Sequence, residues 1–436
     1  MQKSLVIALP MAGWGTRMRP HTWNKPKQLC RLAGATTLDY VMKQFAPLHE
    51  LFEQVKYVFI ISSQDHHQQI SRHMQRHFPD LQVSYVFQTE MNGQSGAIKL
   101  CQEHLAGPMI MSFPDTLIDT EFTSLVNDPD TAVAWGVHVN EPQHYGIAHI
   151  NDEHWIDHIV EKPQKYIGNL AMVGAYYFPS GEQFISAIDR QMERGIKKDP
   201  NDPKDRLTRE YYVVPAINIM IEEDNLKMRV IQAPAMHDTG RPDAMIATNQ
   251  YILEKFWQDR QAEFTRRFEH HVIINPPVAI GDGVQIKNSI IGPNVSIADN
   301  TFIDDAEISD SIIGSKCQIE QVRMKNSLIG DDVTVIDTRT CCRQLNLGDD
   351  ASLTIESPGE TNKKAIVTCH SSATYAERPV AFEWGGKRLE IDAILSRWRT
   401  QFGRGFRVRT KDDRQFTLFY DEGEDDWLIE VFADRP

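Results

Sequence analysis

The sequence is short of cysteine and has no long uninterrupted run of apolar residues. Cysteine accounts for 6 of its 436 residues, and no two of them have CxxC spacing, so neither a disulfide scaffold nor a structural zinc site is indicated. No apolar segment approaches the roughly 20 residues of a membrane span, and the stretch from Leu5 to Leu9 lacks the cleavage pattern of a signal peptide. We therefore expect a cytoplasmic protein with reduced thiols and no membrane partner.

Basic residues are also in deficit, because 46 Lys and Arg face 60 Asp and Glu and leave a formal net charge of −14. This balance argues against broad electrostatic binding to nucleic acid, so a polyanionic substrate would need a local cationic pocket. Hydrophobic residues at 41% and charged residues at 24% are ordinary values for globular proteins. The length is enough for several folded domains.

Residues 1–265 alternate short apolar runs with segments of helical periodicity, which is typical of an α/β domain. We expect strands at 4–9, 55–62, 83–88, 109–113 and 132–137, and helices at 37–45, 64–77, 95–104 and 243–268. The fold predicted for this part is a Rossmann-like, mostly parallel sheet covered by helices.

Residues 272–350 have a different texture, with isoleucine and valine recurring about every five or six residues. One motif occurs three times, as NSIIG at 288–292, DSIIG at 310–314 and NSLIG at 326–330. Such repeats are typical of a left-handed parallel β-helix, in which each rung buries its aliphatic side chain against the next rung. We expect three to four coils, ending near Gly348.

Residues 375–436 are rich in aromatic side chains among alternating patterns such as FRVRT and QFTLFY. The pattern predicts a small α+β domain, formed by a twisted sheet with one helix. Aromatic residues in such a domain are more often its core than a base-stacking platform. Arginines between 397 and 409 leave a binding role open, and we assign this domain no chemistry.

A loop rich in small residues follows the first expected strand. Residues 10–20 read PMAGWGTRMRP, and Lys25, Pro26 and Lys27 come shortly after. Small residues let the backbone approach a phosphate, and Arg17 and Lys27 would add charged donors. The loop is not a Walker motif, since no Gly-Lys-Ser/Thr follows, and Met18 stands where a Rossmann fingerprint has its third glycine. The sequence therefore predicts a phosphate-binding loop of another kind.

Further motifs follow in order, and with this loop they resemble the sugar-1-phosphate nucleotidylyltransferases over roughly residues 4–253. These enzymes make NDP-sugars from a nucleoside triphosphate and a sugar 1-phosphate, and many carry a hexapeptide-repeat tail. The further motifs are Gln88 with Gly93, Phe113-Pro114-Asp115, Tyr145-Gly146, Glu161-Lys162-Pro163, Val173-Gly174-Ala175-Tyr176 and His237-Asp238-Thr239-Gly240. Each motif is weak alone, but their order and spacing together are specific.

The resemblance implies a role for each matching residue. Arg17 would hold the β- and γ-phosphates, Lys27 the α-phosphate, and Lys162 the phosphate of the sugar. The other nucleotide-binding residues would be Ala12, Gly13, Gly15, Thr16, Gln88 and Gly93, of which the last two would contact the base. The sugar-binding residues would be Gly146, Glu161 and Val173.

The resemblance also implies a Mg²⁺ ion shared by Asp115 and Asp238. A sugar-phosphate oxygen would attack the α-phosphorus in line and expel pyrophosphate, so positioning and charge neutralisation would dominate catalysis. A single Asp at a strand end is more commonly a helix cap or a turn residue, and only the ordered set favours a metal site. The segment FPDT stands where the family commonly has GDN, so Thr116 replaces an amide side chain next to Asp115.

Base preference and competing functions stay open at this stage. Ala12 stands where many thymidylyl-type members have glycine, so UTP and dTTP are both expected substrates, with glucose 1-phosphate as the sugar. A non-catalytic sugar-nucleotide sensor or assembly protein is one alternative. Acyl transfer by the β-helix is another, although no histidine lies between Val278 and Leu347. The stacked faces of the β-helix predict a role in assembly or allosteric control, and hence a homo-oligomer.

Overall fold

A computed structural model describes residues 4–195, 210–268, 271–337, 342–355, 367–370, 378–384, 386–400, 403–421 and 426–431. The chain divides into two compact units, residues 1–355 and 356–436. Each unit has its own apolar core. Within the described ranges, no helix combines the length and the apolar character that crossing a membrane requires.

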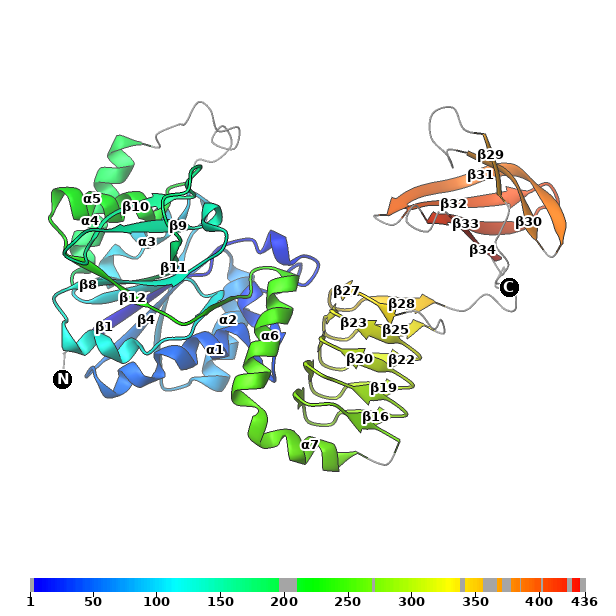
Figure 1. Ribbon diagram of the computed structural model, residues 1–436, viewed down its shortest axis with the longest axis horizontal. Coiled ribbons are helices and arrows are strands. Elements are labelled where there is room, and N and C mark those ends of the chain that lie inside the picture. The colour runs from blue at the N-terminus through cyan, green and yellow to red at the C-terminus, as the bar shows by residue number, and fades with distance from the viewer. Residues whose placement is uncertain are drawn as a thin grey trace. The chain divides into compact units, whose positions relative to one another are not determined.

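The first unit begins with a nine-stranded mixed sheet (Figure 1). Its main path runs in the order β10-β9-β11-β6-β1-β4-β5, and β8 joins β11 to β12. The strands β5, β4, β1 and β6 are parallel to one another, while β11 runs antiparallel to β6, β8 and β9. The bounds are β1 Leu5–Pro10, β4 Val55–Ile61, β5 Gln82–Phe87, β6 Met109–Ser112, β8 Ala132–His138, β9 Gly146–Ile150, β10 Ile156–Glu161, β11 Leu170–Phe178 and β12 Met228–Gln232.

Helices cover both faces of this sheet. Successive side chains of a strand point to opposite faces, and in β1 both sets are apolar, so each face needs a covering layer. Leu5, Ile7 and Leu9 of β1 pack in the core that contains α1, α2 and α6. Val6 and Ala8 pack in the core that contains α3, α4 and α5. The helices are α1 Thr37–Phe45, α2 Gln64–His77, α3 Gln94–Lys99, α4 Gly181–Arg194, α5 Val213–Glu223, α6 Pro242–Phe256 and α7 Gln261–Arg267. The Rossmann-like α/β domain predicted from the sequence, a sheet covered by helices, is confirmed, and its sheet contains both parallel and antiparallel pairs.

Two antiparallel ribbons complete the α/β part. One pairs β7 (Thr116–Ile118) with β13 (Met236–Asp238), and the other pairs β2 (Arg31–Leu32) with β3 (Ala35–Thr36). The single helix expected over 243–268 is broken, because α6 ends at Phe256 and α7 starts at Gln261. Trp257, between them, lies outside helical geometry and stacks on Phe264 of α7.

The rest of the first unit is three five-stranded parallel sheets, which is consistent with a left-handed β-helix (Figure 1). One sheet contains β14 Ile273–Ile274, β17 Ile290–Ile291, β20 Glu307–Ser309, β23 Arg323–Lys325 and β26 Cys342–Arg343. The second contains β15 Val278–Ile280, β18 Val295–Ile297, β21 Ile312–Ile313, β24 Leu328–Ile329 and β27 Asn346–Leu347. The third contains β16 Gln285–Lys287, β19 Phe302–Asp304, β22 Gln318–Glu320, β25 Thr334–Asp337 and β28 Ser352–Ile355.

The β-helix is longer than the sequence predicts. Each sheet has five strands rather than three to four, and the last strand ends at Ile355 instead of near Gly348. In register with the preceding coil, β26 places Arg343 opposite Met324 and β27 places Asn346 opposite Leu328, so two apolar positions of that coil are polar in the last one. Stacking on the preceding coil therefore holds this coil in register without the repeat motif.

The second unit is a six-stranded antiparallel sheet in the order β29 to β34. Its core contains Phe382, Phe406, Phe416 and Trp427, as expected of its aromatic residues. The bounds are β29 Val367–His370, β30 Arg378–Trp384, β31 Lys387–Thr400, β32 Gly403–Thr410, β33 Gln415–Asp421 and β34 Asp426–Val431. The predicted helix is not found among its described residues. The register of β31 shifts twice, after Ile391 and after Ile394, and such bulges disturb the alternation that marks a strand.

Candidate active site

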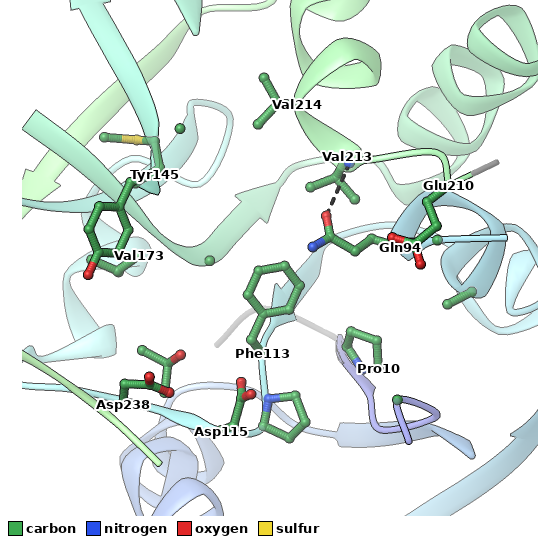
Figure 2. A pocket seen from close by; sticks show the side chains of 18 of the residues that line it. Pro10, Gln94, Phe113, Asp115, Tyr145, Val173, Glu210, Val213, Val214 and Asp238 are labelled. Carbon is green, nitrogen blue, oxygen red and sulfur yellow. Dashed lines mark hydrogen bonds between the residues drawn. The ribbon is translucent and has the colours of Figure 1, made fainter. Parts of the chain in front are cut away.

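A cavity of about 500 Å³ opens where the loop after β1 meets the ends of β6, β10 and β13 (Figure 2). It gathers residues that are far apart in the sequence, at the edge where parallel strands end, which is the usual binding edge of α/β sheets. Of the residues predicted from the sequence, those that line it are Ala12, Gly13, Arg17, Lys27, Gln88, Gly93, Asp115, Gly146, Glu161, Lys162, Val173 and Asp238. Their individual roles stay predictions.

Two predicted nucleotide-binding residues, Gly15 and Thr16, are not among the lining residues. Gly15 has a left-handed backbone with φ of 61°, and a Cβ there would lie 3.2 Å from the side chain of Thr22. The Thr22 hydroxyl donates to the carbonyl oxygen of Gly15 at 2.8 Å. Thr16 begins the short 3₁₀ turn that contains Arg17. Gly15 and Thr16 therefore form the start of the turn that places Arg17 at the cavity.

Lys27 and Asp115 form an ion pair inside the cavity. Lys27 begins a 3₁₀ turn, Lys27–Leu29, and Asp115 follows the end of β6. Burial alone would raise the pKa of Asp115, but the ammonium of Lys27 and the guanidinium of Arg17 lower it below its usual value. Asp115 is therefore ionised at neutral pH, with two cations beside it.

Asp115 and Asp238 lie close together at the ribbon formed by β7 and β13 (Figure 2). A Cβ added to Gly240 would lie 2.9 Å from Oδ1 of Asp238, 3.2 Å from Nη2 of Arg17 and 3.3 Å from Oδ2 of Asp115. Burial raises the pKa of Asp238, and the neighbouring Asp115 charge adds to the effect. Two carboxylates this close repel each other, so the pair is suited to a cation.

The two carboxylates fit a magnesium ion whose other ligands would come from the phosphates of a substrate and from water. Within the described residues, no group of three or more His, Cys, Asp or Glu is arranged to hold a metal ion. Mg²⁺ commonly uses only one or two carboxylates and takes its remaining ligands from phosphates and water. The space beside Gly240, which a single methyl group would fill, borders both carboxylates.

Gln88 and Gly93 lie near the start of α3, and internal contacts orient both residues. Gln88 is 4% exposed, and its Nε2 donates to Oδ1 of Asn92 and to the carbonyl oxygen of Gly93, each at 3.1 Å. Gly93 has φ of 96°, and a Cβ there would lie 2.5 Å from the backbone nitrogen of Tyr211. Glycine is therefore required here by a positive φ and by the close approach of the Tyr211 backbone.

Glu161 and Lys162 stand at the end of β10 beside the start of β9. Their side chains approach to 3.5 Å, and a Cβ on Gly146 would lie 3.2 Å from Oε2 of Glu161. Burial raises the pKa of Glu161, and Lys162 opposes that shift only in part. The Lys162 ammonium lies 4.8 Å from the centre of the Tyr212 ring. This end of the cavity pairs a cation with a hydrogen-bond acceptor, which suits a phosphate beside sugar hydroxyls.

Sequence reasoning assigned no role to several residues that shape the cavity. Phe113 lies between the two carboxylates and Gln94 in Figure 2, and its ring packs on Gly174, where a Cβ would overlap the ring. Gly174 belongs to the motif Val173-Gly174-Ala175-Tyr176, and its positive φ of 77° is a backbone conformation that favours glycine. Gln28, which follows Lys27 and does not itself line the cavity, is 1% exposed, and its amide atoms have no hydrogen-bond partner among the described residues. A buried amide without a partner is a signal that only the structure supplies.

The chain is similar in sequence to known proteins over most of its length. A family model described as nucleotidyl transferase matches residues 7–255, and one described as the GMPPB C-terminal domain matches residues 260–347. The bifunctional protein GlmU of Methanococcus aeolicus is 25% identical over 323 residues, which cover 69% of this chain and 71% of that protein. The glucose-1-phosphate thymidylyltransferase of Streptomyces antibioticus is 26% identical over 352 residues, covering 74% and 89%. The solved structure of a UDP-glucose pyrophosphorylase from Acinetobacter baumanii aligns with a TM-score of 0.45 at 17% identity, covering 61% and 98%.

Proposed function

The chain belongs to the nucleotidyl transferase family, and on that premise we propose that it transfers a nucleoside monophosphate from dTTP or UTP to glucose 1-phosphate, with release of pyrophosphate. The coarser activity, that of a sugar-1-phosphate nucleotidyltransferase, is supported by the matching family model and by the thymidylyltransferase relative. The geometry of the cavity supports the substrates, the metal and the residue roles that we propose.

One observation carries the proposal: Arg17, Asp115 and Asp238 all border the space beside the Cα of Gly240. Lys27 joins the same group through its ion pair with Asp115. Opposed charges this close, on segments distant in the sequence, suit the binding of a triphosphate together with a metal ion. A sensor that only bound a finished sugar nucleotide would not need a second carboxylate at this point.

The residues suit an in-line transfer. Lys27 and Arg17 would neutralise the triphosphate, whose negative charge otherwise repels an incoming phosphate monoester. Lys162 would hold the sugar phosphate from the opposite end of the cavity, where Glu161 would accept hydrogen bonds from sugar hydroxyls. A phosphate oxygen is already an adequate nucleophile, so these residues would act by orientation and charge rather than as a general base.

Mg²⁺ is the cofactor that the carboxylates favour. Asp115 and Asp238 would be its protein ligands, and when bound it would neutralise phosphate charge and orient the α-phosphate. Lys27 pairs with Asp115 in this structure, so Lys27 would exchange that carboxylate for a phosphate oxygen when the metal and the nucleotide enter.

The oriented amide of Gln88 supports a pyrimidine with an N–H to donate. Its Nε2 is committed to Asn92 and Gly93, so its carbonyl oxygen is the group suited to the base. Uracil and thymine both present an N3–H, whereas cytosine presents an acceptor at that atom. This contact supports dTTP or UTP over CTP but does not separate the first two.

The experiment is pyrophosphate release with Mg²⁺ across UTP, dTTP, CTP, GTP and ATP, each combined with glucose, mannose, galactose and N-acetylglucosamine 1-phosphates. Strong turnover is expected for glucose 1-phosphate with UTP or dTTP. Arg17→Ala and Asp115→Asn should remove it, while Arg323→Ala, at an exposed arginine of β23 in the β-helix, should not. Absence of turnover throughout, with folded protein, would contradict the proposal and favour the sensor.

A further inference from the structure

The segment from Pro20 to Arg31 follows the Arg17 turn, carries Lys27 and lies against the last two coils of the β-helix. His21 is 3% exposed, and its Nε2 is 2.6 Å from Oδ1 of Asn346 in β27. A Cβ added to Gly348 would lie 2.9 Å from Cβ of Pro20. The end of the β-helix therefore packs directly on a segment that also borders the active-site cavity.

Lys25 is the charged centre of this contact. Its ammonium donates to Oδ1 of Asp349 at 2.8 Å and to Oδ2 of Asp331 at 3.0 Å, and its side chain is only 14% exposed. Arg31, at the other end of the segment, lies 3.7 Å from Oδ1 of Asp331. Two coils of the β-helix thus hold one lysine between their carboxylates.

The two aspartates are fixed by the β-helix before they meet Lys25. Oδ1 of Asp349 accepts the amide of Asp331 at 2.9 Å, and Oδ1 of Asp331 accepts the amide of Ser315 at 2.8 Å. Asp299, two coils before Asp331, accepts the amide of Asp282 in the same way at 2.9 Å. The carboxylates of Asp331 and Asp349 are therefore each fixed by a backbone amide of the preceding coil, and both contact the lysine.

The charges of this contact stabilise one another. Burial alone would lower the pKa of Lys25, but Asp331 and Asp349 together raise it above its usual value. Burial alone would raise the pKa of Asp331, but Lys25 and the amide of Ser315 lower it. Lys25 is partly buried and has two fixed acceptors. Its ion pairs therefore restrain the backbone at Lys25 more than a solvent-exposed ion pair would.

Only Pro26 separates Lys25 from Lys27. Pro26 has an extended backbone and precedes the 3₁₀ turn that begins at Lys27, so it allows little rotation between the two lysines. We propose that Lys25 is a positioning residue, through which Asp331 and Asp349 of the β-helix fix the segment that presents Lys27 to the nucleotide. The β-helix is then a structural part of the active site. This inference rests on the proposed function only for the role of Lys27.

The test compares Lys25→Met with the wild type by hydrogen exchange and by kinetics. The amides of Leu29 and Cys30 close the turn at Lys27, with hydrogen bonds of 2.9 and 3.1 Å, and they report its order directly. In Lys25→Met we expect these amides to exchange at least about tenfold faster because local opening becomes easier. We also expect kcat to fall about tenfold and KM for the nucleotide to rise, with KM for the sugar 1-phosphate within about twofold.

Matched variants separate positioning from general stability. Lys25→Arg keeps the charge and should restore both readouts. Asp349→Asn keeps an oxygen for the Asp331 amide but loses the charge, so it should loosen the same turn while the β-helix amides stay protected. Arg323→Met removes an exposed arginine that lies 3.3 Å from Glu307 on the β-helix, and it should change neither readout.

Each arm can overturn the inference. Unchanged exchange at Leu29 and Cys30 in Lys25→Met would show that the β-helix does not brace the turn. Faster exchange with unchanged kcat would show that bracing has no bearing on catalysis. If the wild type is inactive with every substrate pair, the proposed function fails, whereas the exchange arm still decides whether Lys25 orders the segment.

Discussion

Thr239 is joined to Asp115 by two hydrogen bonds across 124 residues of sequence. Its backbone amide donates to the carbonyl oxygen of Asp115 at 2.9 Å, and its hydroxyl donates to the same oxygen at 3.0 Å. Thr239 is 3% exposed and directly follows Asp238. Thr239 thus clamps the segment of Asp238 to the backbone of Asp115, which holds the two carboxylates near each other.

Replacing Thr239 by valine should loosen this clamp while keeping the shape of the side chain. One of the two hydrogen bonds is lost, and we expect kcat to fall about tenfold, which corresponds to about 1.4 kcal/mol. Thr239→Ser keeps the hydroxyl and should stay within about twofold of the wild type. Steady-state pyrophosphate release measures both variants. Equal rates for valine and serine would show that the hydroxyl bond to Asp115 does not contribute to catalysis.

A methyl group at Gly240 should block the site with little effect on folding. The added Cβ would lie 3.3 Å or less from Asp238, Arg17 and Asp115, in the space that we assign to the metal and phosphate. Gly240 does not have a positive φ, so alanine should not strain the backbone. We expect Gly240→Ala to lose at least about 100-fold in kcat/KM, with a melting temperature within about 3 °C of the wild type. Near-normal turnover with an unchanged Mg²⁺ requirement would place the metal elsewhere.

Asp39 stabilises the start of α1 in a strongly pH-dependent way. Its Oδ2 accepts the amide of Thr36 at 2.7 Å, and its Oδ1 is 2.8 Å from Nε2 of His73. Burial alone would raise the pKa of Asp39, but His73 and Thr36 lower it to about 2. The stabilisation should therefore be complete above the unfolded value near 3.8 and be lost as the pH falls through about 2.

Urea unfolding of Asp39→Asn checks this sign. At pH 7 the variant should have a free energy of unfolding lower by about 2 kcal/mol, and the difference should shrink as the pH falls toward 2. Asp243→Asn, at a side chain that is 72% exposed, should show little difference at any pH. A deficit in Asp39→Asn that does not depend on pH would assign the loss to packing rather than to charge.

Local signals predicted the fold where a cap or a repeat marks an element. α1 and α2 have the expected bounds because Thr36 and Ser63 cap them, each accepting a backbone amide in the first turn. The fifth coil of the β-helix carries no motif, and the predicted helix at 243–268 breaks at Trp257, where tertiary stacking overrides the periodicity. In these places, contacts with distant residues decide the structure.

The site was predictable to the extent that its residues belong to ordered motifs. Asp115, Glu161 and Asp238 reach one cavity as the motif order implies. The part played by Gly240 depends on β13 crossing beside β7, and that of Lys25 depends on carboxylates about 300 residues further along the chain. Neither relationship leaves a local signal in the sequence, because both are created by the packing of segments far apart in the chain.

Glu161 should set the acid limit of sugar binding. Burial raises the pKa of this carboxyl, so it should lose its charge, and with it a strong acceptor for sugar hydroxyls, at a higher pH than an ordinary glutamate. KM for the sugar 1-phosphate should therefore rise as the pH is lowered from neutrality, at a higher pH than for an ordinary glutamate, while KM for the nucleotide changes much less. In Glu161→Gln this KM should be high throughout. Titration of the substrate's phosphate, near pH 6, is common to both enzymes, so the difference between their profiles isolates Glu161. Parallel profiles would mean that Glu161 does not contact the sugar in its ionised form.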